Sequence, residues 1–383
     1  MKRRYFEIRD VLKKHPGMTM YFIFGERSNG KTYSCLDLAL EEYAEHGWQA
    51  AYIRRSLEDV KTKYSSGLYT GHISNGRFDK FFGNLPLPWN STIIKNGCLY
   101  PRNVHYSESG KQYTKTADKP LLIIQALSTW QHSKGISFPD VKTIIFDEFL
   151  TNDMYLPDEV NTFQNIVSSF VRDRGDVKIF MLGNTVSRFS PYFTELGLTH
   201  VSEMNPGDSH VYTSGDGKAK YLLMFTDRTD KKDSDKYFSV FNNNSSKMIT
   251  GGGWEMSAYP IVPSDLYGTK PIETFFISYS NHLVRGDIVE HNQRLFILFR
   301  PSTQARLFQE GNVRDRNWYP DKVCYTDFYS RNLYDRIGIT NQRDNLSKIV
   351  SKLVREGSVY FATNNTGDLV SHYFKWSLQY SVI

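Results

Sequence analysis

The stretch FGERSNGKTYS, Phe24–Ser34, contains the pattern that decides the fold of the first part of the chain. Gly25, Gly30, Lys31 and Thr32 satisfy the signature G-x-x-x-x-G-K-[ST] of a loop that binds nucleoside triphosphates. The glycines permit a tight turn whose backbone N–H groups surround phosphate oxygens, the lysine reaches the outer phosphates, and the threonine hydroxyl ligates Mg²⁺. We therefore predict ATP and Mg²⁺ as ligands of a loop formed by Gly25, Glu26, Arg27, Ser28, Asn29, Gly30, Lys31 and Thr32.

The loop lies within alternating strand and helix patterns, which favours a phosphate site over an ordinary glycine turn. Short apolar runs bounded by turn residues are typical of strands buried on both faces of a parallel sheet. Apolar residues at helical spacing follow in 34–46, which ends at Gly47, and in 158–174, which ends at Gly175. The alternation predicts an α/β domain with a doubly wound, mostly parallel sheet. Its strands are expected at 20–24, 49–53, 121–127, 141–146 and 177–182, with an antiparallel hairpin inserted at 95–116.

The segment TIIFDEF, Thr143–Phe149, supplies the second half that such a site requires, an apolar strand ending in acids. Asp147 is predicted to hold the magnesium ion, and Glu148 to polarise the attacking water. Two exposed carboxylates at a strand end are common in proteins. The phosphate loop at a suitable separation favours the catalytic interpretation.

Other polar residues are candidates because of the strand or helix ends that they follow. Asn184 follows the fifth predicted strand, at the edge where ligands bind in α/β folds, and is placed to sense the γ-phosphate or its water. An ordinary turn asparagine would fit there equally. Arg172 and Lys134 are candidates for cations acting on a neighbouring subunit's nucleotide, with a solvated helix cap as the alternative for the arginine. Arg54 and Arg55 end the second strand and could contact nucleotide or nucleic acid.

Composition is that of a globular protein with a mild excess of positive charge. The 383 residues are 40% hydrophobic and 15% aromatic, and the formal net charge is +6, which suits a polyanionic partner without requiring one. Cys35, Cys98 and Cys324 have no zinc-site or disulfide spacing, which suits a reducing cytoplasm. The N-terminal segment 1–14 lacks the apolar run of a signal peptide, and no membrane span is expected.

A change in composition divides the chain into a first domain at 1–225, a linker or lid at 226–264 and a second domain at 265–383. The second domain is predicted as a smaller α+β unit, with two strands flanking a turn around Arg285–Asp287. Asp287 is its best single acid for metal-dependent cleavage, but no convincing acidic partners stand at strand ends, so a non-cutting domain is expected. Its segment 345–357 predicts an amphipathic helix with one apolar face formed by Leu346, Ile349, Val350, Leu353 and Val354.

Six stretches of the first half occur in one order with gaps similar to those of a known family: FIFGERSNGKT, AAYIRRS, STWQHSKGISFPDVKTIIFDEF, YLPDEV, FVRDRGDVKIFMLGNTVS and PYF. Together they resemble the phi29-type DNA encapsidation ATPases, the ring motors that package phage genomes. The resemblance covers about 19–195 and is faint over 200–383. This chain departs from the family in a longer insertion around 60–118 and a longer C-terminal region.

The resemblance implies roles for residues at matching positions. Lys31 and Thr32 would contact phosphate and metal, and Asp147–Glu148 would be the Walker B acids. Arg172, the first arginine of RDR, matches the family's trans-acting finger, and Lys134 matches a second trans-acting cation. The family's C-terminal domain resembles an RNase H-like nuclease that has lost its catalytic acids.

The resemblance also implies an ASCE-type P-loop ATPase that acts as a homo-oligomeric ring, with five subunits expected. The ring would sit on the portal of a prohead in the host cytoplasm and drive double-stranded DNA inward, without a membrane partner. A packaging RNA ring stays open as a partner, since its contacts fall where the match is faint. Three alternatives also remain: a helicase, a large terminase with an active nuclease, and a P-loop switch that controls assembly without translocation.

Overall fold

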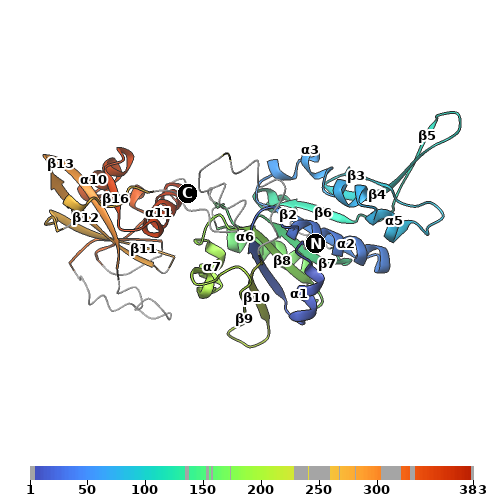
Figure 1. Cartoon of the computed structure of the whole chain (residues 1–383), viewed down its shortest axis with the longest axis horizontal. Coiled ribbons are helices and arrows are strands. Elements are labelled where there is room, and N and C mark those ends of the chain that lie inside the picture. Colours follow the sequence, from blue (N-terminus) through green and yellow to red (C-terminus); the bar gives the residue numbers. More distant parts are fainter. Residues whose placement is uncertain are drawn as a thin grey trace. The chain divides into compact units, whose positions relative to one another are not determined.

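The computed structural model describes residues 5–133, 138–151, 155–156, 158–172, 174–227, 240, 259–266, 268–280, 282–302, 321–327 and 333–380. Most of the predicted linker at 226–264 therefore lies outside the described residues. The chain forms two units, which are described separately (Figure 1). The first comprises Met1–Thr151, Asp158–Val186 and His200–Trp254, and the second Asn152–Pro157, Ser187–Thr199 and Glu255–Ile383.

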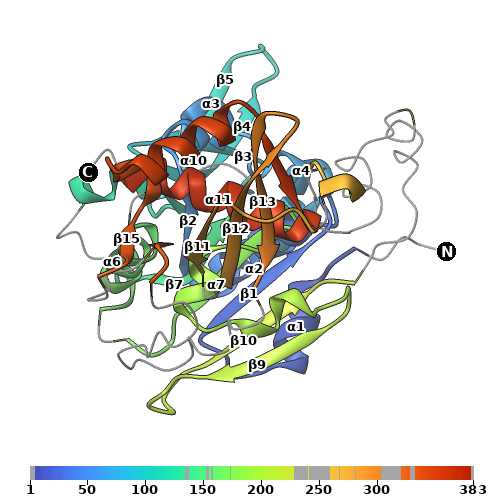
Figure 2. The ribbon, with the colours of Figure 1, turned by 90° about the vertical axis from the view of Figure 1, so that its left-hand side faces the viewer.

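The first unit contains a ten-stranded sheet with the order β3-β4-β6-β2-β7-β8-β1-β10-β9, and β5 pairs with β4. The six strands from β6 to β10 in this order are parallel to their neighbours, which confirms the predicted mostly parallel sheet. The last of them, β10, was not predicted; with β9 it forms an antiparallel pair beside β1 at one edge (Figure 2). The parallel strands are β1 Met20–Gly25, β2 Gln49–Arg54, β6 Leu122–Ala126, β7 Val141–Asp147, β8 Lys178–Asn184 and β10 Lys220–Phe225. The antiparallel ones are β3 Ser91–Lys95, β4 Cys98–Tyr106, β5 Gln112–Thr116 and β9 Ser209–Thr213.

The strand order positions the candidate site. β8 lies between β1 and β7, which is the interposed strand expected for the ASCE type. Because parallel strands end at the same edge of a sheet, their C-terminal residues meet there. Gly25 at the end of β1 is in register with Asn184, and Asp147 at the end of β7 is in register with Leu182.

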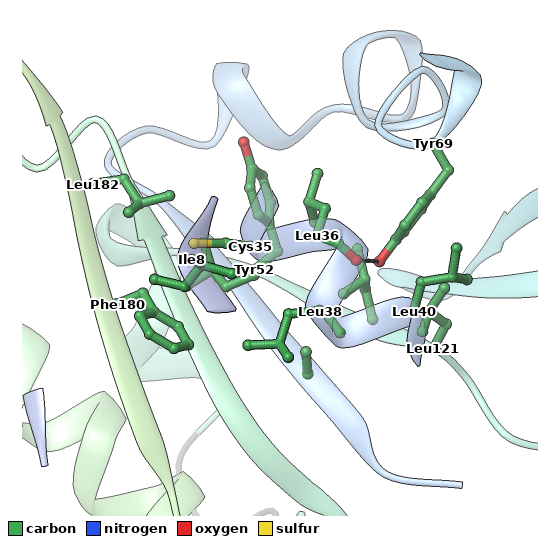
Figure 3. Close-up of a cluster of buried hydrophobic side chains, with 14 of the residues drawn as sticks. Ile8, Cys35, Leu36, Leu38, Leu40, Tyr52, Tyr69, Leu121, Phe180 and Leu182 are labelled. Atoms are coloured by element: carbon green, nitrogen blue, oxygen red, sulfur yellow. Dashed lines mark hydrogen bonds between the residues drawn. The ribbon is translucent and has the colours of Figure 1, made fainter. Parts of the chain in front are cut away.

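Helices cover both faces of this sheet, as the predicted doubly wound fold requires. On one face α1, α2, α4 and α5 pack against the strands through a buried cluster that includes Ile8, Leu36 and Phe180 (Figure 3). On the other face Phe163 of α6 stacks on Phe146 of β7, with ring centroids 5.2 Å apart. The helices are α1 Ile8–Lys14, α2 Lys31–His46, α3 Thr62–Ser65, α4 Thr70–Ser74, α5 Arg77–Phe82 and α6 Glu159–Val171, with short 3₁₀ helices at Glu58–Val60, Leu127–Ser133 and Thr199–Ser202.

Helix α2 ends at His46, as the sequence predicts, and begins at Lys31, three residues before the predicted stretch 34–46. Gly30 precedes it with φ 98° and Gly47 follows it with φ 68°, both in the left-handed region that favours glycine. The Gly47 N–H donates to the Tyr43 carbonyl at 2.9 Å and closes the last turn. In the middle of the helix the buried hydroxyl of Tyr69 donates to the Leu36 carbonyl at 3.0 Å (Figure 3), which fixes the inserted helices against it.

The predicted end of the second helix at Gly175 is wrong. Helix α6 ends at Val171, and Arg172 itself adopts the left-handed conformation that closes it, with φ 34°. Its N–H donates to the Ser168 carbonyl at 3.1 Å, so the hydrogen bond that a C-cap glycine would make is present without a glycine.

The second unit has a six-stranded sheet with the order β15-β14-β11-β12-β13-β16. β11, β12 and β13 form an antiparallel meander, and the other strands join it in parallel. Helices α10 and α11 bury one face of the sheet with residues that include Val350, Leu369 and Tyr373, which agrees with the predicted α+β architecture. The elements are α7 Pro191–Glu195, β11 Glu273–Tyr279, β12 His282–His291, β13 Arg294–Pro301, β14 Cys324–Thr326, β15 Asp335–Ile337, α10 Asn345–Arg355, β16 Val359–Phe361 and α11 Asn364–Tyr380, with 3₁₀ helices at Ser264–Leu266 and Ile339–Asn341.

Two details of the second unit correct the sequence analysis. The turn predicted around Arg285–Asp287 is wrong, because these residues lie inside β12, and the real turns involve Ser280, Asn292 and Gln293 with positive φ. In α10 the predicted apolar face is confirmed except at Ile349, whose side chain is 40% exposed. None of the helices in the described part of the chain has the length and apolarity to cross a membrane.

Candidate functional site

The phosphate loop connects the end of β1 to the start of α2 in a backbone conformation suited to anions. Ser28 and Gly30 both have positive φ, of 58° and 98°. At Gly25 a Cβ atom would lie 1.9 Å from the Thr226 hydroxyl oxygen, so this glycine is required by a close approach from the chain after β10. Asn29 fixes Thr226 against the loop, because its side-chain amide donates to the Thr226 hydroxyl at 2.8 Å. The loop is therefore built before any ligand enters it.

Lys31 lies back on its own loop. Its side chain is buried, and Nζ donates to the Glu26 carbonyl at 2.8 Å and to Asn29 Oδ1 at 3.1 Å. A buried ammonium is stable only when its donors are satisfied, and here neutral oxygens satisfy them. Phosphate oxygens entering the loop would offer this ammonium negatively charged partners. The residues present thus fit a triphosphate.

Asp147, Thr32 and Tyr52 form one hydrogen-bonded cluster. The Thr32 hydroxyl donates to Asp147 Oδ1 at 2.9 Å, and the Tyr52 hydroxyl donates to Asp147 Oδ2 at 2.8 Å. Burial raises the pKa of the Tyr52 hydroxyl well above its ordinary value, so it stays a donor. Carboxylate and hydroxyl oxygens are the ligands that Mg²⁺ prefers, so the donor set fits the predicted ion. Tyr52 was missed by the sequence analysis, because its role follows from β2 pairing with β7.

Glu148 follows Asp147 in a strained backbone conformation, with φ 61°. Its side chain is 52% exposed, so water can reach the carboxylate. Arg54 Nη2 lies 2.5 Å from Glu148 Oε2, and Arg54 Nη1 lies 3.7 Å from Asp147 Oδ2. Burial would lower the pKa of Arg54, but the neighbouring Tyr52 and Glu148 raise it, so the guanidinium stays charged beside both acids.

Arg55 has a different position from its neighbour Arg54. It pairs with the buried carboxylate of Glu159 on α6, at 2.8 Å from Nε. Its other nitrogens donate to the carbonyls of Glu148 and Phe149, at 3.1 and 2.8 Å. Arg55 thus fixes the backbone turn that carries the acids, a role that no local sequence pattern indicated.

The loop, the acids and the end of β8 line one cavity of about 460 Å³. Asn184 is among its lining residues, as predicted, next to Gly183. Gly183 packs closely, since a Cβ there would lie 3.0 Å from Phe149 and Leu150 side-chain atoms. The lining residues are Arg27, Ser28, Asn29, Gly30, Lys31, Thr32, Tyr33, Asp147, Glu148, Leu182, Gly183 and Asn184.

Some predicted site residues are not brought to this cavity. Gly25 and the buried Glu26 belong to the loop but do not line the cavity. Arg54 does not line it either, and contacts the site by its ion pair with Glu148. Arg172 is exposed at the end of α6 and does not line the cavity of its own chain. Lys134 lies outside the described residues.

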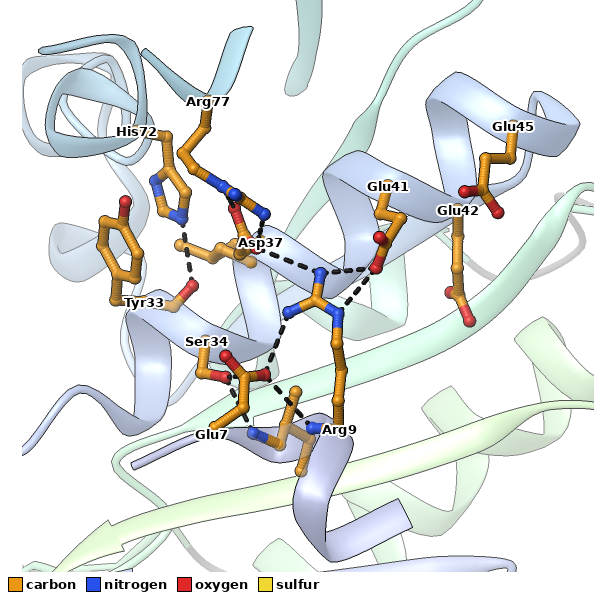
Figure 4. A network of polar contacts seen from close by, with 12 residues as sticks. Glu7, Arg9, Tyr33, Ser34, Asp37, Glu41, Glu42, Glu45, His72 and Arg77 are labelled. Atoms are coloured by element: carbon orange, nitrogen blue, oxygen red, sulfur yellow. Dashed lines mark hydrogen bonds and ion pairs between the residues drawn. The ribbon is translucent and has the colours of Figure 1, made fainter. Parts of the chain in front are cut away.

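The N-terminal segment braces the loop and the start of α2 (Figure 4). The Phe6 N–H donates to the Asn29 carbonyl at 2.9 Å, and the Ser34 hydroxyl donates to Glu7 at 3.0 Å. Further along α2, the nearly buried Asp37 accepts from Arg9 at 3.0 Å and from Arg77 Nε at 2.6 Å. Arg77 begins α5, so this one carboxylate joins the N-terminal helix, the phosphate-loop helix and the insertion.

In the second unit Asp287 is buried and already paired. It accepts from the Thr274 hydroxyl and from Arg285 Nε, both at 2.8 Å. Among the described residues, no three His, Cys, Asp or Glu side chains are grouped so that they could hold a metal ion.

Comparison with known proteins gives a consistent family resemblance. Residues 109–211 match the family model of the podovirus DNA encapsidation protein (Gp16). The DNA packaging protein of Bacillus phage B103 is 28% identical over 180 residues, 46% of this chain and 47% of the relative. The DNA packaging protein of Bacillus phage phi29 is 27% identical over 177 residues, 45% of this chain and 44% of the relative. The aligned part thus spans about half the length of these relatives.

A solved structure extends the similarity of the fold. The bacteriophage Phi-29 viral genome packaging motor assembly matches with a TM-score of 0.54 and 18% identity, covering 97% of this chain and 99% of that chain. At this identity the match shows the fold. The chain is therefore a homologue of the DNA packaging proteins of phi29-like phages, which confirms the resemblance found in its sequence.

Proposed function

We propose that this homologue of the phi29-type packaging proteins is an ATP-driven motor that moves double-stranded DNA into a phage prohead. The observation that carries the proposal is the single cavity that contains the phosphate loop, the Asp147–Glu148 pair and Asn184. A cavity that only bound nucleotide would not need a half-exposed carboxylate beside the magnesium-side acid. We infer the task, DNA packaging, from the packaging proteins that this chain resembles.

In the proposed mechanism, the loop N–H groups and Lys31 bind the triphosphate, and the Lys31 ammonium exchanges its neutral partners for phosphate oxygens. Thr32 and Asp147 would hold Mg²⁺, which neutralises charge on the phosphates. Asn184 senses the γ-phosphate or its water from the end of β8.

Glu148 is proposed to orient the attacking water. In the structure its carboxylate is held by Arg54, 2.5 Å away. Glu148 already lines the cavity, so hydrolysis requires only that its carboxylate be released from Arg54. In this mechanism the ion pair with Arg54 controls when the Glu148 carboxylate is free to orient water. Arg54 remains beside the acids throughout, because it also lies near Asp147.

Arg172 and Lys134 are proposed to act on the nucleotide of a neighbouring subunit, where positive charge stabilises the transition state. The exposure of Arg172 and its absence from the cavity lining of its own chain support a role in trans. This arrangement requires a homo-oligomeric ring, which we propose to be a pentamer on the portal of the prohead in the host cytoplasm. A packaging RNA ring is a further partner in this proposal.

The second unit is proposed not to cut DNA. The carboxylate of Asp287 forms an ion pair with Arg285 and a hydrogen bond with Thr274, and two-metal cleavage needs several converging carboxylates. This domain, proposed to span 265–383 after a linker or lid at 226–264, would instead couple the nucleotide state to DNA or to the portal.

The test is DNA-stimulated ATPase activity with purified proheads, with and without packaging RNA. We expect duplex DNA to increase turnover, and Lys31→Ala to remove it because the ammonium no longer meets the phosphates. Robust turnover by Lys31→Ala would refute the site. Turnover indifferent to DNA would favour an assembly switch, and metal-dependent cutting of plasmid DNA would favour a terminase with an active nuclease.

A further inference from the structure

The strand pair β4–β5 extends beyond the sheet as a two-stranded ribbon (Figure 1). β4 pairs with β3 up to Arg102 and with β6 only at Cys98 and Leu99. From Asn103 to Tyr106 its partner is β5 alone. The base of this outer part is covered, because Asn103 is buried and its amide donates to the Pro88 carbonyl. Beyond it His105 and Tyr106 are exposed, and so is every residue of β5 up to Lys115.

The ribbon is held in a defined shape by hydrogen bonds at both ends. At the tip, the Ser107 N–H donates to the Lys111 carbonyl at 2.9 Å, and Gly110 provides the left-handed residue of the turn with φ 78°. At the base, the Asn90 side chain makes two 2.9 Å hydrogen bonds with the backbone of Val104. The part of the arm from His105 outward is thus ordered and exposed, although it contributes little to the buried core.

One face of the ribbon combines cations and aromatic rings. Residues that pair across two strands lie on the same face, so the pairs His105–Tyr113 and Asn103–Lys115 share a face. The His105 and Tyr113 rings stack with centroids 5.4 Å apart, and Lys111 Nζ lies 5.3 Å from the Tyr113 ring. The aromatic pair gives this face a rigid centre between two ammonium groups.

The charge of the segment is strongly one-sided. From Ser91 to Thr116 it contains Lys95, Arg102, Lys111 and Lys115 against the single acid Glu108, whereas the whole chain has 47 basic and 41 acidic residues. No ion pair joins these four cations to an acid within the described ranges. Unneutralised cations on an ordered exposed surface complement a polyanion.

We propose that this ribbon, residues 102–116, is an arm that binds duplex DNA through its phosphates. A two-stranded ribbon fits the major groove of B-form DNA, which is about 12 Å wide, whereas the major groove of A-form RNA is deep and narrow. Lysines without acceptor groups contact phosphates without reading bases, which suits a cargo of any sequence. The inference rests on the proposed function for the identity of the cargo and adds the surface that contacts it.

The experiment measures binding of the full chain to a random-sequence DNA duplex by fluorescence anisotropy as salt is varied. Each lost phosphate contact reduces the slope of log K against log salt by about 0.9. K111Q/K115Q should therefore lower the slope by about 1.8, which weakens binding about 60-fold at 0.1 M salt relative to the 1 M reference. K13Q/K14Q is the matched control, because it removes the same charge from exposed lysines at the end of α1 and should leave the slope unchanged.

Three results would overturn the proposal: an unchanged slope for K111Q/K115Q, an equal slope change in K13Q/K14Q, or no measurable duplex binding by the wild-type chain at low salt. An equal loss of affinity for a duplex RNA of the same length would also overturn the assignment to DNA. Basal ATPase activity without DNA should not change in K111Q/K115Q, because the arm does not line the nucleotide cavity. If K111Q/K115Q lowers the salt slope as expected but DNA does not stimulate the wild-type ATPase, the DNA-binding arm stands and the proposed motor function is refuted. If DNA stimulates the wild-type ATPase but K111Q/K115Q leaves the slope unchanged, the motor function stands and the arm is refuted.

Discussion

Tyr52→Phe tests the interpretation of the magnesium-side acid more directly than removal of the acid itself. The substitution deletes only the hydroxyl that donates to Asp147 Oδ2 at 2.8 Å and leaves the buried ring in place. Asp147 would keep its other hydrogen bond, from Thr32. The perturbation therefore changes how the carboxylate is held without changing the charge of the site.

The magnitude follows from the kind of group that is lost. A side chain that orients a metal ligand typically contributes 10–100-fold to metal affinity, which corresponds to about 1.4–2.7 kcal/mol. A hydrogen bond to a charged group contributes about 1.5–3 kcal/mol to stability. We expect Tyr52→Phe to raise the Mg²⁺ concentration for half-maximal ATPase activity about 10–100-fold, with a comparable loss in the free energy of unfolding.

The assay is ATPase rate against free Mg²⁺ at saturating ATP, combined with urea unfolding of the same preparations. Tyr69→Phe is the matched control, because the Tyr69 hydroxyl is equally buried but donates to the Leu36 carbonyl, away from the acids. It should lose about 1 kcal/mol of stability and keep the wild-type Mg²⁺ requirement. A Mg²⁺ requirement within twofold of wild type in Tyr52→Phe, or an equal shift in Tyr69→Phe, would refute the reasoning.

Further predictions concern catalysis, folding and pH. Glu148→Gln should bind ATP and hardly hydrolyse it, and mixing it with Arg172→Ala subunits should restore some turnover; no recovery at any mixing ratio would argue against a finger in trans. Asp37→Asn should lower the free energy of unfolding by about 2–4 kcal/mol, because Arg77 and Arg9 both lose their paired carboxylate. In an Arg77→Met background the same change should cost less, because only the pair with Arg9 remains to be lost, as measured by urea unfolding. Burial, followed by the charge of a nearby lysine, lowers the pKa of His372 to about 4, so the unfolded state binds more protons below pH 6.5. Stability should therefore fall by about 3 kcal/mol as the pH drops from 6.5 to 4, and His372→Gln should flatten that fall in a pH series of unfolding curves.

The sequence was sufficient where chemistry and local pattern coincide. The phosphate loop, the Asp147–Glu148 pair and Asn184 all stand at ends of continuous apolar strands, and the structure brings all of them to one cavity. Tyr52 and Arg55 could not be found in this way. Their contacts with Asp147 and Glu159 depend on which strands become neighbours, and no pattern in β2 specifies its pairing with β7.

The wrong turn at Arg285–Asp287 has a physical reason. Arg, Gly and Asp in sequence are typical of a turn, but Gly286 is required by packing: a Cβ there would lie 2.4 Å from the Phe275 ring. Asp287 is compatible with a strand because Arg285 and Thr274 satisfy its carboxylate. The strand is therefore set by contacts with β11, which the local turn preference of Arg-Gly-Asp does not reveal.

The brace formed by the N-terminal segment has a practical consequence for dissecting the molecule. A fragment that started at β1, Met20, would contain the whole phosphate-loop signature and both Walker B acids. It would nevertheless lack the Phe6 hydrogen bond to Asn29 and the Glu7 and Arg9 contacts with α2. The smallest fragment that keeps the phosphate loop braced is thus longer than its motifs suggest, and loss of nucleotide binding in a fragment cut at β1 would say nothing about the motifs themselves.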